Sequence, residues 1–527
     1  MNCKLNTYHM KKTFLATLLC ALFFVGNAQD PQTGTLDETF GTDGVARISP
    51  SSYFDFISAL LVQPDGKILT VGRSRQDGAN YTVYTARVNS DGTVDDIYGN
   101  GGVALFQADP LLYLNESRDA VLAADGTLMI AGHLYDPSGV NKSFLLNVDE
   151  NGFLNTYFGD NGYVFSEDGH GIVYESIDVD SQGRMVVSGY RDDKLLVARF
   201  TPTGEPDTSF GTDGMVVLEF DEYPFSFSWT LKCDMNDNII VGGARMDNTT
   251  TYCGMVCKLD TNGALDTSFG TNGIVDLNIG IGHEYVLAMD IQQNGDIVVA
   301  GHSWLANQPD LIYEAYITRI TSDGQVDTNF GTNGYTKFAP YARASHSCYG
   351  LTIAQDGQIF GTFYAYVYNT GESAAYVFNL DTNGQPKADF ADNGLYRFEF
   401  TEPEIQASEA AMQSDGKLLI GGYLYDGNIA SEVFVTRFNT DVVTESVSEM
   451  SNDTYKVYPN PATSMIFVES DVDADANLSI IDVTGRVVRE MIFNNNAIVN
   501  IEDLNSGVYF IKIQDDNNQT IQKIVVE

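Results

Sequence analysis

GTLDETFGTDG, residues 34–44, is the first of seven copies of one pattern along the chain. The other six copies begin at Gly92, Gly152, Gly204, Gly263, Gly324 and Gly384, at intervals of 52 to 61 residues. A fixed period of this length is typical of stacked supersecondary units rather than of unrelated domains. The repeat therefore decides the fold class before any single residue is considered.

Each copy is followed by a second pattern, which reads ALLVQPDGKILTVG at residues 59–72. Apolar residues alternate before the Asp-Gly turn and run almost continuously after it, which predicts a β-hairpin. A third strand ends in TARVNSDG (85–92), and a fourth follows the FGxxG turn. Seven such units predict an all-β, seven-bladed β-propeller of four-stranded antiparallel blades at residues 29–441. A linear β-solenoid is the alternative, which the long hairpins disfavour.

The strand count predicts how the ring closes. The repeats begin with a fourth strand, 44–48, and end with a third strand, 432–438. The blades are complete only if the first strand pairs with the last, nearly 390 residues later. This closure would remove the open sheet edges that promote aggregation.

A charge pattern indicates structural ion pairs. A cation in the third strand stands eight residues before an aspartate in four repeats, and where the cation is lost the aspartate is lost too. Arg437 has no downstream partner, and Asp37 holds the matching place at the start of the ring. We expect exposed pairs worth about 1 kcal/mol or less each. The pairs are Arg87–Asp95, Arg199–Asp207, Lys258–Asp266, Arg319–Asp327 and Arg437–Asp37.

The repeated residues resemble the delta-60 repeat, a bacterial β-propeller repeat. The resemblance covers about residues 34–441 and all seven units. It implies the propeller fold and implies no activity.

The N-terminus predicts export. Lys11 and Lys12 precede an apolar run that ends near Ala28, so residues 1–28 read as a signal peptide. No later segment is apolar enough to serve as a transmembrane anchor. The net charge of −42 argues against nucleic-acid or membrane-surface partners. Four cysteines remain after cleavage, either as disulfides or as buried thiols: Cys233, Cys253, Cys257 and Cys348. We expect a monomer.

A polar linker, residues 442–453, leads to a C-terminal segment, 454–527, whose short alternating strands predict a small β-sandwich. Its motifs are similar to the type A sorting domain of the Bacteroidetes type IX secretion system. The resemblance implies the secretion machinery as a partner and a secreted or cell-surface location. Asp471, Asp473 and Asp475 alternate as in a calcium loop, but Ala476 replaces the glycine that such a loop needs. The residues that carry the resemblance include Tyr458, Pro459, Asn460, Pro461, Gly485, Gly507 and Lys523.

No catalytic signature is present: the chain has no GxSxG, HExxH or phosphate-loop motif, and its histidines do not pair at metal spacing. We therefore expect no metal and no cofactor. Isolated carboxylates are abundant, so an acid pair could still assemble at the propeller axis.

One face of the propeller differs from repeat to repeat. Loops between strands four and one, and between strands two and three, leave on this face, while the repeated turns lie on the other. The variable loops are rich in aromatic residues, which suit binding of a glycan or a protein surface. We predict a non-enzymatic binding module here. The alternatives are aromatics that only pack loops, a glycan-active hydrolase or lyase with axial carboxylates, and a structural surface-layer component. The candidate ligand-binding residues are Trp229, Trp304, His133, His302, Tyr364 and Tyr423.

Overall fold

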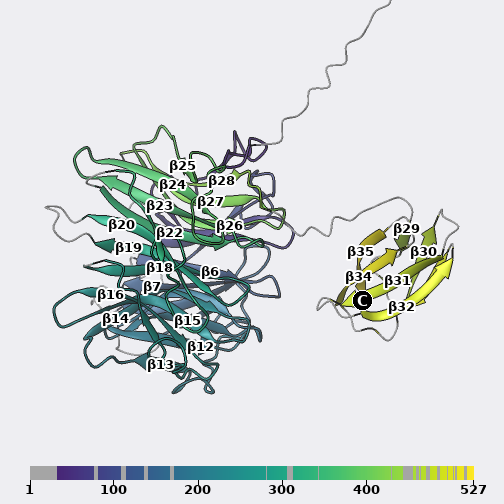
Figure 1. Ribbon diagram of the computed structural model, residues 1–527, viewed down its shortest axis with the longest axis horizontal. Helices are drawn as coiled ribbons and strands as arrows, with labels where there is room; N and C mark the ends of the chain where they lie inside the picture. The colour runs from purple at the N-terminus through teal and green to yellow at the C-terminus, as the bar shows by residue number, and fades with distance from the viewer. Residues whose placement is uncertain are drawn as a thin grey trace, which may run out of the picture.

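The computed structural model describes two bodies, a large propeller and a small C-terminal sandwich (Figure 1). The predicted signal peptide and linker lie almost wholly outside the described residues. These residues run from 32 to 526 with gaps at 76–80, 108–113, 136–140, 167–170, 281, 305–311, 342–343, 429, 443–454, 459–461, 463, 471–474, 483–486, 495, 502–503, 505–506 and 515–518.

The described part of the propeller forms seven four-stranded antiparallel sheets, so the all-β, bladed prediction is confirmed. A single parallel bridge, Tyr81 to Leu114, joins the first two sheets. Blade one is β2 (Asp55–Val62), β3 (Ile68–Arg75), β4 (Tyr81–Val88) and β5 (Val103–Phe106). Blade two is β6 (Leu114–Leu122), β7 (Leu128–Tyr135), β8 (Asn141–Val148) and β9 (Tyr163–Phe165). Blade three is β10 (Ile172–Val179), β11 (Met185–Arg191), β12 (Lys194–Phe200) and β13 (Met215–Leu218).

The remaining blades follow the same order. Blade four is β14 (Phe225–Cys233), β15 (Ile239–Met246), β16 (Tyr252–Leu259) and β17 (Ile274–Asp276). Blade five is β18 (Glu284–Ile291), β19 (Ile297–Trp304), β20 (Tyr313–Ile320) and β21 (Tyr335–Phe338). Blade six is β22 (Ala344–Ile353), β23 (Ile359–Val367), β24 (Glu372–Leu380) and β25 (Leu395–Arg397). Blade seven is β26 (Glu404–Met412), β27 (Leu418–Tyr425), β28 (Ser431–Phe438) and β1 (Val45–Ile48).

The first strand of each blade is the innermost one. Each inner strand contacts the inner strand of the next blade, and β26 contacts β2, so the contacts make a closed ring. Every inner strand also carries a β-bulge, which inserts one extra residue near its middle and bends the strand. The extra residues are Ser58, Arg118, Glu175, Trp229, Leu287, Tyr349 and Ser408.

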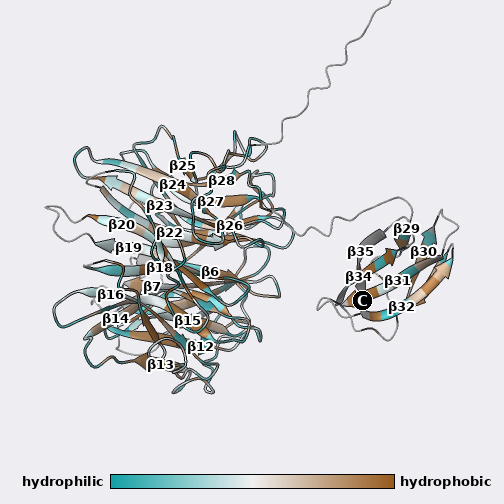
Figure 2. Cartoon of the chain, in the orientation of Figure 1, coloured by the Kyte–Doolittle hydropathy of each residue, from teal (hydrophilic) through white to brown (hydrophobic). Residues whose placement is uncertain are grey.

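The repeated FG motif explains why the blades dock. Its aromatic residue is almost fully buried in every repeat, as for Phe40, Phe210 and Phe330 at 0% exposure. The glycine that opens a repeat touches the preceding turn, because a Cβ on Gly92 would lie 2.4 Å from the backbone nitrogen of Gly41. The most hydrophobic segments accordingly lie within the strands (Figure 2).

The ring closes as predicted. β1 pairs with β28 in antiparallel register from Val45 opposite Thr436 to Ile48 opposite Val433. The N-terminal strand is therefore the outer strand of blade seven. Its bounds differ from the predicted ones by a single residue at one end.

The predicted cations are more deeply placed than the sequence suggested. The Arg199 side chain is 2% exposed and its Nε lies 2.8 Å from Asp207 Oδ2. Its guanidinium covers the Phe210 ring at 4.6 Å and donates from Nη1 to the carbonyl of Thr261, at 2.6 Å, in the next repeat. The expectation of exposed pairs is therefore wrong, because the FG aromatic residue and the neighbouring blade cover the cation. Equivalent inter-repeat bonds run from Arg87 to Glu150, from Arg319 to Thr382 and from Arg437 to Ser90.

The predicted pair Lys258–Asp266 does not form. Lys258 Nζ lies 3.4 Å from Asp234 Oδ2 in the hairpin turn of its own blade. The lysine ammonium group is a compact point charge, whereas the arginine guanidinium is a planar fork of several N–H donors. Lys258 therefore cannot hold Asp266 and also reach the next repeat. Lys258 acts on Asp266 only at longer range.

The four cysteines among the described residues are free thiols in the structure. Cys257 and Cys348 are fully buried, and burial raises the pKa of the Cys257 thiol to about 12. The alternative of buried thiols therefore holds for these two residues.

The C-terminal segment forms two sheets around one apolar core, as predicted for a sandwich. Ile466, Ile480 and Ile511 are among its fully buried residues. Of the sorting-motif residues, Tyr458 ends β29, Gly507 begins β34 and Lys523 lies in β35, while Pro459, Asn460, Pro461, Gly485 and the calcium-like Asp471 and Asp473 lie outside the described residues. The sheets are β29 (Tyr455–Tyr458), β30 (Met465–Ser470) and β33 (Ala497–Asn500), and β32 (Val487–Asn494), β31 (Asp475–Asp482), β34 (Gly507–Gln514) and β35 (Gln519–Val526).

Candidate functional site

Seven equivalent positions lie at the variable-loop end of the second strands, directly beside the inner strands. Because the strands are antiparallel, the end of a second strand and the start of an inner strand share this end of the blade. Tyr423, for example, is the cross-strand partner of Gln406, and His302 is the partner of Tyr285. We call these positions the mouth positions. They are Arg73, His133, Tyr190, Ala244, His302, Tyr364 and Tyr423.

Blades four and five carry an aromatic cluster at this end. The rings of Trp229 and Tyr285 lie 5.3 Å apart edge to face, and Tyr285 is 4.9 Å from His302. His283 stacks on Trp304 at 5.2 Å with an interplanar angle of 26°. All the rings are half-buried, so each keeps an accessible part. The cluster comprises Phe227, Trp229, Tyr252, His283, Tyr285, His302, Trp304 and Tyr313.

The aromatic cluster is uncharged at neutral pH. Burial lowers the pKa of His302 to about 4. Burial also lowers the pKa of His283, although Asp247 opposes it. The backbone N–H of Tyr252 donates to His283 Nδ1 at 3.1 Å, which leaves the imidazole proton on Nε2. The cluster therefore offers neutral rings with a few polar edges.

A second feature of this end is a small cavity of about 210 Å³ between blades seven, one and two, here called the mouth pocket. Phe56 and Tyr423 form its aromatic wall, with ring centroids 4.8 Å apart edge to face. The Arg73 guanidinium lies 4.8 Å from the Phe56 ring and 5.2 Å from Tyr81. The lining residues are Phe56, Ile57, Ser58, Arg73, Ser117, Arg118, Gln406, Ser408 and Tyr423.

The cations of the mouth pocket are paired with carboxylates. Arg73 forms an ion pair with Glu116, and Arg118 Nε donates to Glu175 Oε2 at 2.6 Å. His133 Nε2 lies 3.8 Å from Glu116, but burial and the charges of Arg118 and Arg73 lower its pKa to about 3. His133 is therefore neutral, and the four charged groups balance.

Three aspartates on the inner strands tie neighbouring blades together. Asp119 Oδ2 accepts the backbone N–H of Ile177 at 3.0 Å, in the next blade. In the same way, the backbone N–H of Cys233 donates to Asp178 Oδ2 and the backbone N–H of Ile353 donates to Asp290 Oδ2, each at 2.8 Å. A carboxylate that accepts backbone N–H groups is held in place by the fold.

Lys232 and Glu409 are titratable groups of the inner strands that lie close enough to these aspartates to feel their charge. Burial opposes ionisation of Lys232, but Asp178, Asp290 and Asp119 outweigh it and raise the pKa of the ammonium group. Burial and the charge of Asp119 raise the pKa of Glu409 to about 8. Glu409 therefore carries a proton at neutral pH beside an aspartate. No group of three or more His, Cys, Asp or Glu side chains in the described parts of the chain is placed to hold a metal ion.

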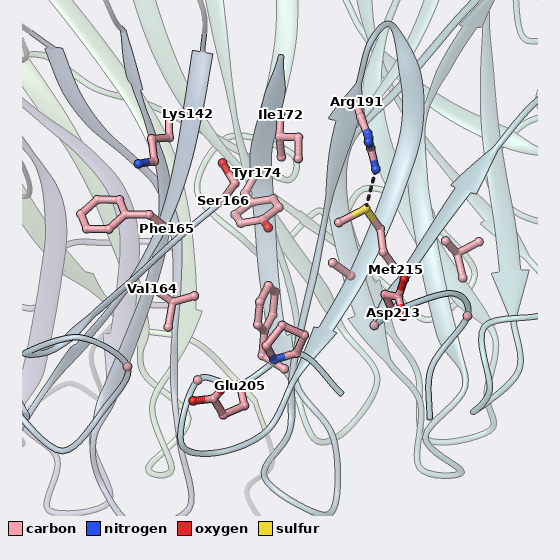
Figure 3. A pocket seen from close by; sticks show the side chains of 18 of the residues that line it. Lys142, Val164, Phe165, Ser166, Ile172, Tyr174, Arg191, Glu205, Asp213 and Met215 are labelled. Atoms are coloured by element: carbon pink, nitrogen blue, oxygen red, sulfur yellow. Dashed lines mark hydrogen bonds between the residues drawn. The ribbon is translucent and has the colours of Figure 1, made fainter. Parts of the chain in front are cut away.

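Another cavity, about 1240 Å³, is a groove on the flank between blades two and three (Figure 3). Lys142 lies over the Phe165 ring at 4.9 Å, and Arg191 donates to Met215 Sδ at 3.4 Å on the opposite side (Figure 3). The carboxylates of its lining are Asp160, Glu205 and Asp213, and Glu205 lies at the other end of the groove from both cations (Figure 3).

The structure places the predicted ligand-binding residues in separate parts of the variable-loop end rather than in one site. Trp229, Trp304 and His302 join one cluster, Tyr423 lines the mouth pocket, and His133 is buried beside it. The tryptophans are not in loops as predicted: Trp229 is the bulge residue of β14 and Trp304 is the last residue of β19. Tyr364 occupies the mouth position of blade six. The sequence reading missed Arg73, Arg118 and Phe56, although the position after the second-strand glycine would have indicated Arg73.

Two protein families match parts of the chain. Residues 456–527 match the secretion system C-terminal sorting domain. Residues 63–96, 181–210, 236–269, 292–330 and 413–441 match the domain of unknown function DUF5122 β-propeller. The sorting domain indicates a secreted or outer-surface location. No helix among the described residues is long and apolar enough to cross a membrane.

No curated protein matches the sequence. Among solved structures, a protein of unknown function from Dyadobacter fermentans has 12% identity and a TM-score of 0.41, covering 75% of this chain and 98% of that one. A PL25 ulvan lyase has 9% identity and a TM-score of 0.42, covering 76% and 95%. A GH93 α-L-arabinofuranosidase of Fusarium graminearum has 12% identity and a TM-score of 0.36, covering 60% and 92%.

Proposed function

Because the chain is a β-propeller protein of DUF5122 repeats that ends in a secretion-system C-terminal sorting domain, we propose that it is an extracellular glycan-binding protein without catalytic activity. The observation that carries this proposal is the aromatic cluster of blades four and five. The cluster joins Trp229 to Trp304 through Tyr285, Tyr252 and His283 on the variable-loop side.

The chemistry of the cluster favours a sugar over a charged ligand. Sugars present C–H faces that stack on aromatic rings and hydroxyl groups that bond to their polar edges. Both histidines are neutral at pH 7, so the cluster supplies no cation for an anionic ligand. The net charge of −42 repels polyanions further.

The test is the affinity of the full chain for a panel of oligosaccharides, measured by calorimetry. Trp229→Ala and Trp304→Ala should each weaken binding about tenfold or more, as expected when a central aromatic contact is removed. Phe165→Ala is the matched control, because Phe165 also belongs to a stacked aromatic pair, with Tyr163, but lies in the flank groove. Unchanged binding in both tryptophan variants would overturn the proposal.

A second candidate function is glycan cleavage by inner-strand carboxylates. The observation that favours it is Glu409, which is protonated at neutral pH and lies close enough to Asp119 to feel its charge. A proton donor beside a carboxylate is the pairing that general acid catalysis requires. Against it, Asp119 is already bonded to Ser176 and Ile177. Product release from polysaccharides by the wild type, lost in Glu409→Gln, would replace the binding proposal with this one.

A further inference from the structure

We infer that the mouth pocket is a second ligand site, which takes one neutral sugar residue of the glycan. This inference rests on the proposed function for the glycan itself but on different residues for the site. The pocket is lined by blades seven, one and two, whereas the aromatic cluster belongs to blades four and five. Both lie at the same end of the blades, since Arg73, Tyr423 and His302 hold equivalent mouth positions.

The size of the pocket limits its occupant. Pockets for drug-sized ligands span about 300–1,000 Å³, and the mouth pocket holds about 210 Å³. Such a volume suits a single six-membered ring rather than a chain or a peptide. The occupant would therefore be one residue of a longer glycan.

The lining matches both sides of a sugar ring. Phe56 and Tyr423 offer aromatic surface for the C–H face. The hydroxyls of Ser58 and Ser117 lie 2.9 Å from each other at the wall, and the Tyr423 hydroxyl donates to Gln406 Oε1 at 2.8 Å. Hydroxyl and amide groups both donate and accept hydrogen bonds, as sugar hydroxyls do.

The charges favour a neutral sugar over a uronate or a sulfated one. Arg73 and Arg118 are the cations of the lining, and each already shares its charge with a carboxylate, Glu116 or Glu175. Asp119, beside Arg118 on β6, adds a further carboxylate, whose charge Lys232 opposes. An anionic ligand would therefore enter a balanced or negative environment.

The Arg73 side chain is preorganised to contact such a ligand. Its guanidinium is held between its ion pair with Glu116 and the faces of Phe56 and Tyr81. A planar guanidinium fixed in this way loses little freedom when it donates to a ligand oxygen. We assign Arg73 and Tyr423 as the polar contacts that orient the sugar.

The test uses tetrasaccharides of glucose, galactose and mannose, with tetragalacturonate and a sulfated carrageenan tetrasaccharide as anionic members. At least one neutral member should bind, with little change in affinity between low and high salt. Tyr423→Phe and Arg73→Gln should each weaken that binding about fivefold to twentyfold, the loss expected for one or two hydrogen bonds. Tyr190→Phe, at the mouth position of blade three, should leave it unchanged.

The outcomes separate this inference from the proposed function. Loss of binding in Tyr423→Phe but in neither Trp229→Ala nor Trp304→Ala would keep the pocket and overturn the aromatic cluster as a binding site. The reverse pattern would overturn the pocket. Tighter binding of either anionic member, or binding by no member of the panel, would also overturn it. Thermal unfolding of each variant excludes misfolding as the cause of a loss.

Discussion

Arg437 Nε lies 3.0 Å from Asp37 Oδ2, which joins two residues 400 positions apart in the chain. The same guanidinium covers the Phe40 ring at 4.8 Å and donates to the carbonyl of Ser90 in the first blade. One side chain thus links blade seven, the N-terminal segment and blade one. The closing contact of the ring is built like the inter-repeat contacts within it.

This contact predicts the effect of neutralising Asp37. Asp37→Asn should lower the free energy of unfolding by about 1–3 kcal/mol at pH 7, because Arg437 then stays largely buried without its counter-charge. Burial raises the pKa of Asp37, but bonds from Thr39 and the charges of Arg437 and Lys417 outweigh it and leave the pKa lowered. A carboxyl group whose pKa is lowered by folding stabilises the fold at pH values above its unfolded-state pKa. This stabilisation is lost as the pH falls through the folded-state pKa. The difference from wild type should therefore vanish at low pH.

Urea unfolding at several pH values measures this difference. Asp43→Asn is the control, since Asp43 is exposed in the same segment and Asn tolerates its positive φ of 53°. Deleting residues 32–48 should cost far more than Asp37→Asn, because it removes β1 and exposes the edge of β28. Equal stability of the deletion and the wild type would contradict the closure.

The difference between Lys258 and the arginines predicts a pair of opposite substitutions. Arg199→Lys should lose the bond to Thr261 and cost about 1–2 kcal/mol, because lysine cannot reproduce the fork. Lys258→Arg should gain the inter-repeat bond that the other blades have, and should raise the unfolding midpoint. The two midpoints, measured in guanidinium chloride, should move in opposite directions. A shift of the same sign in both variants would be inconsistent with the inter-repeat role.

Two repeats expose large apolar residues where others carry a hydrogen-bonding side chain. Ile97 is 78% and Tyr157 is 93% exposed, whereas Ser209 at the same place donates to Asp207 Oδ1 at 2.6 Å. Tyr157→Ser should let the new hydroxyl donate to Asn155, and should stabilise the turn by about 0.5–1 kcal/mol. Ser209→Tyr is the reverse variant and should destabilise by a similar amount. Calorimetric midpoints check both changes.

The propeller was predictable because its determinants recur in every repeat. Phe210 and its equivalents and the hairpin turns each repeat a pattern that the chain displays seven times, and Arg437 repeats the third-strand cation that four other blades carry. The depth of the Arg199 pair was not predictable in the same way. Only packing shows that the ring of Phe210 and the turn at Thr261 cover the guanidinium.

The candidate sites were harder to predict because they lie where the repeats differ. Arg73, His302 and Tyr423 hold one structural position, but three different residue types conceal the equivalence. The bulges also break the alternation of the inner strands, so Trp229 reads as a loop residue although it lies in β14. Arg118 was missed for the same reason.

The sorting domain predicts a defect in export rather than in folding. A chain that ends at Asp441 keeps all the strands of the seven blades, since β28 ends at Phe438. Its thermal midpoint should therefore match that of the propeller transition in the full chain. In the native host it should accumulate in the periplasm, as judged by fractionation and immunoblotting against the full chain. Normal amounts in the medium would contradict the assigned role of residues 456–527.

Glu409 predicts a pH dependence of the opposite sign to Asp37. Burial and Asp119 raise its pKa to about 8, so the folded state keeps a proton that the unfolded chain releases near the ordinary glutamate value of 4.5. The free energy of unfolding should thus fall as the pH rises from 4.5 to about 8.

Glu409→Gln removes this loss of stability, because the amide is neutral at every pH. The variant should match the wild type in acid and exceed its stability by on the order of 5 kcal/mol above the folded-state pKa. Urea midpoints at pH values across this window measure the difference, with Glu404→Gln, on the same strand, as the control. A constant difference between Glu409→Gln and wild type at every pH would show that Glu409 ionises normally, and would remove the proton donor on which the hydrolase or lyase alternative depends.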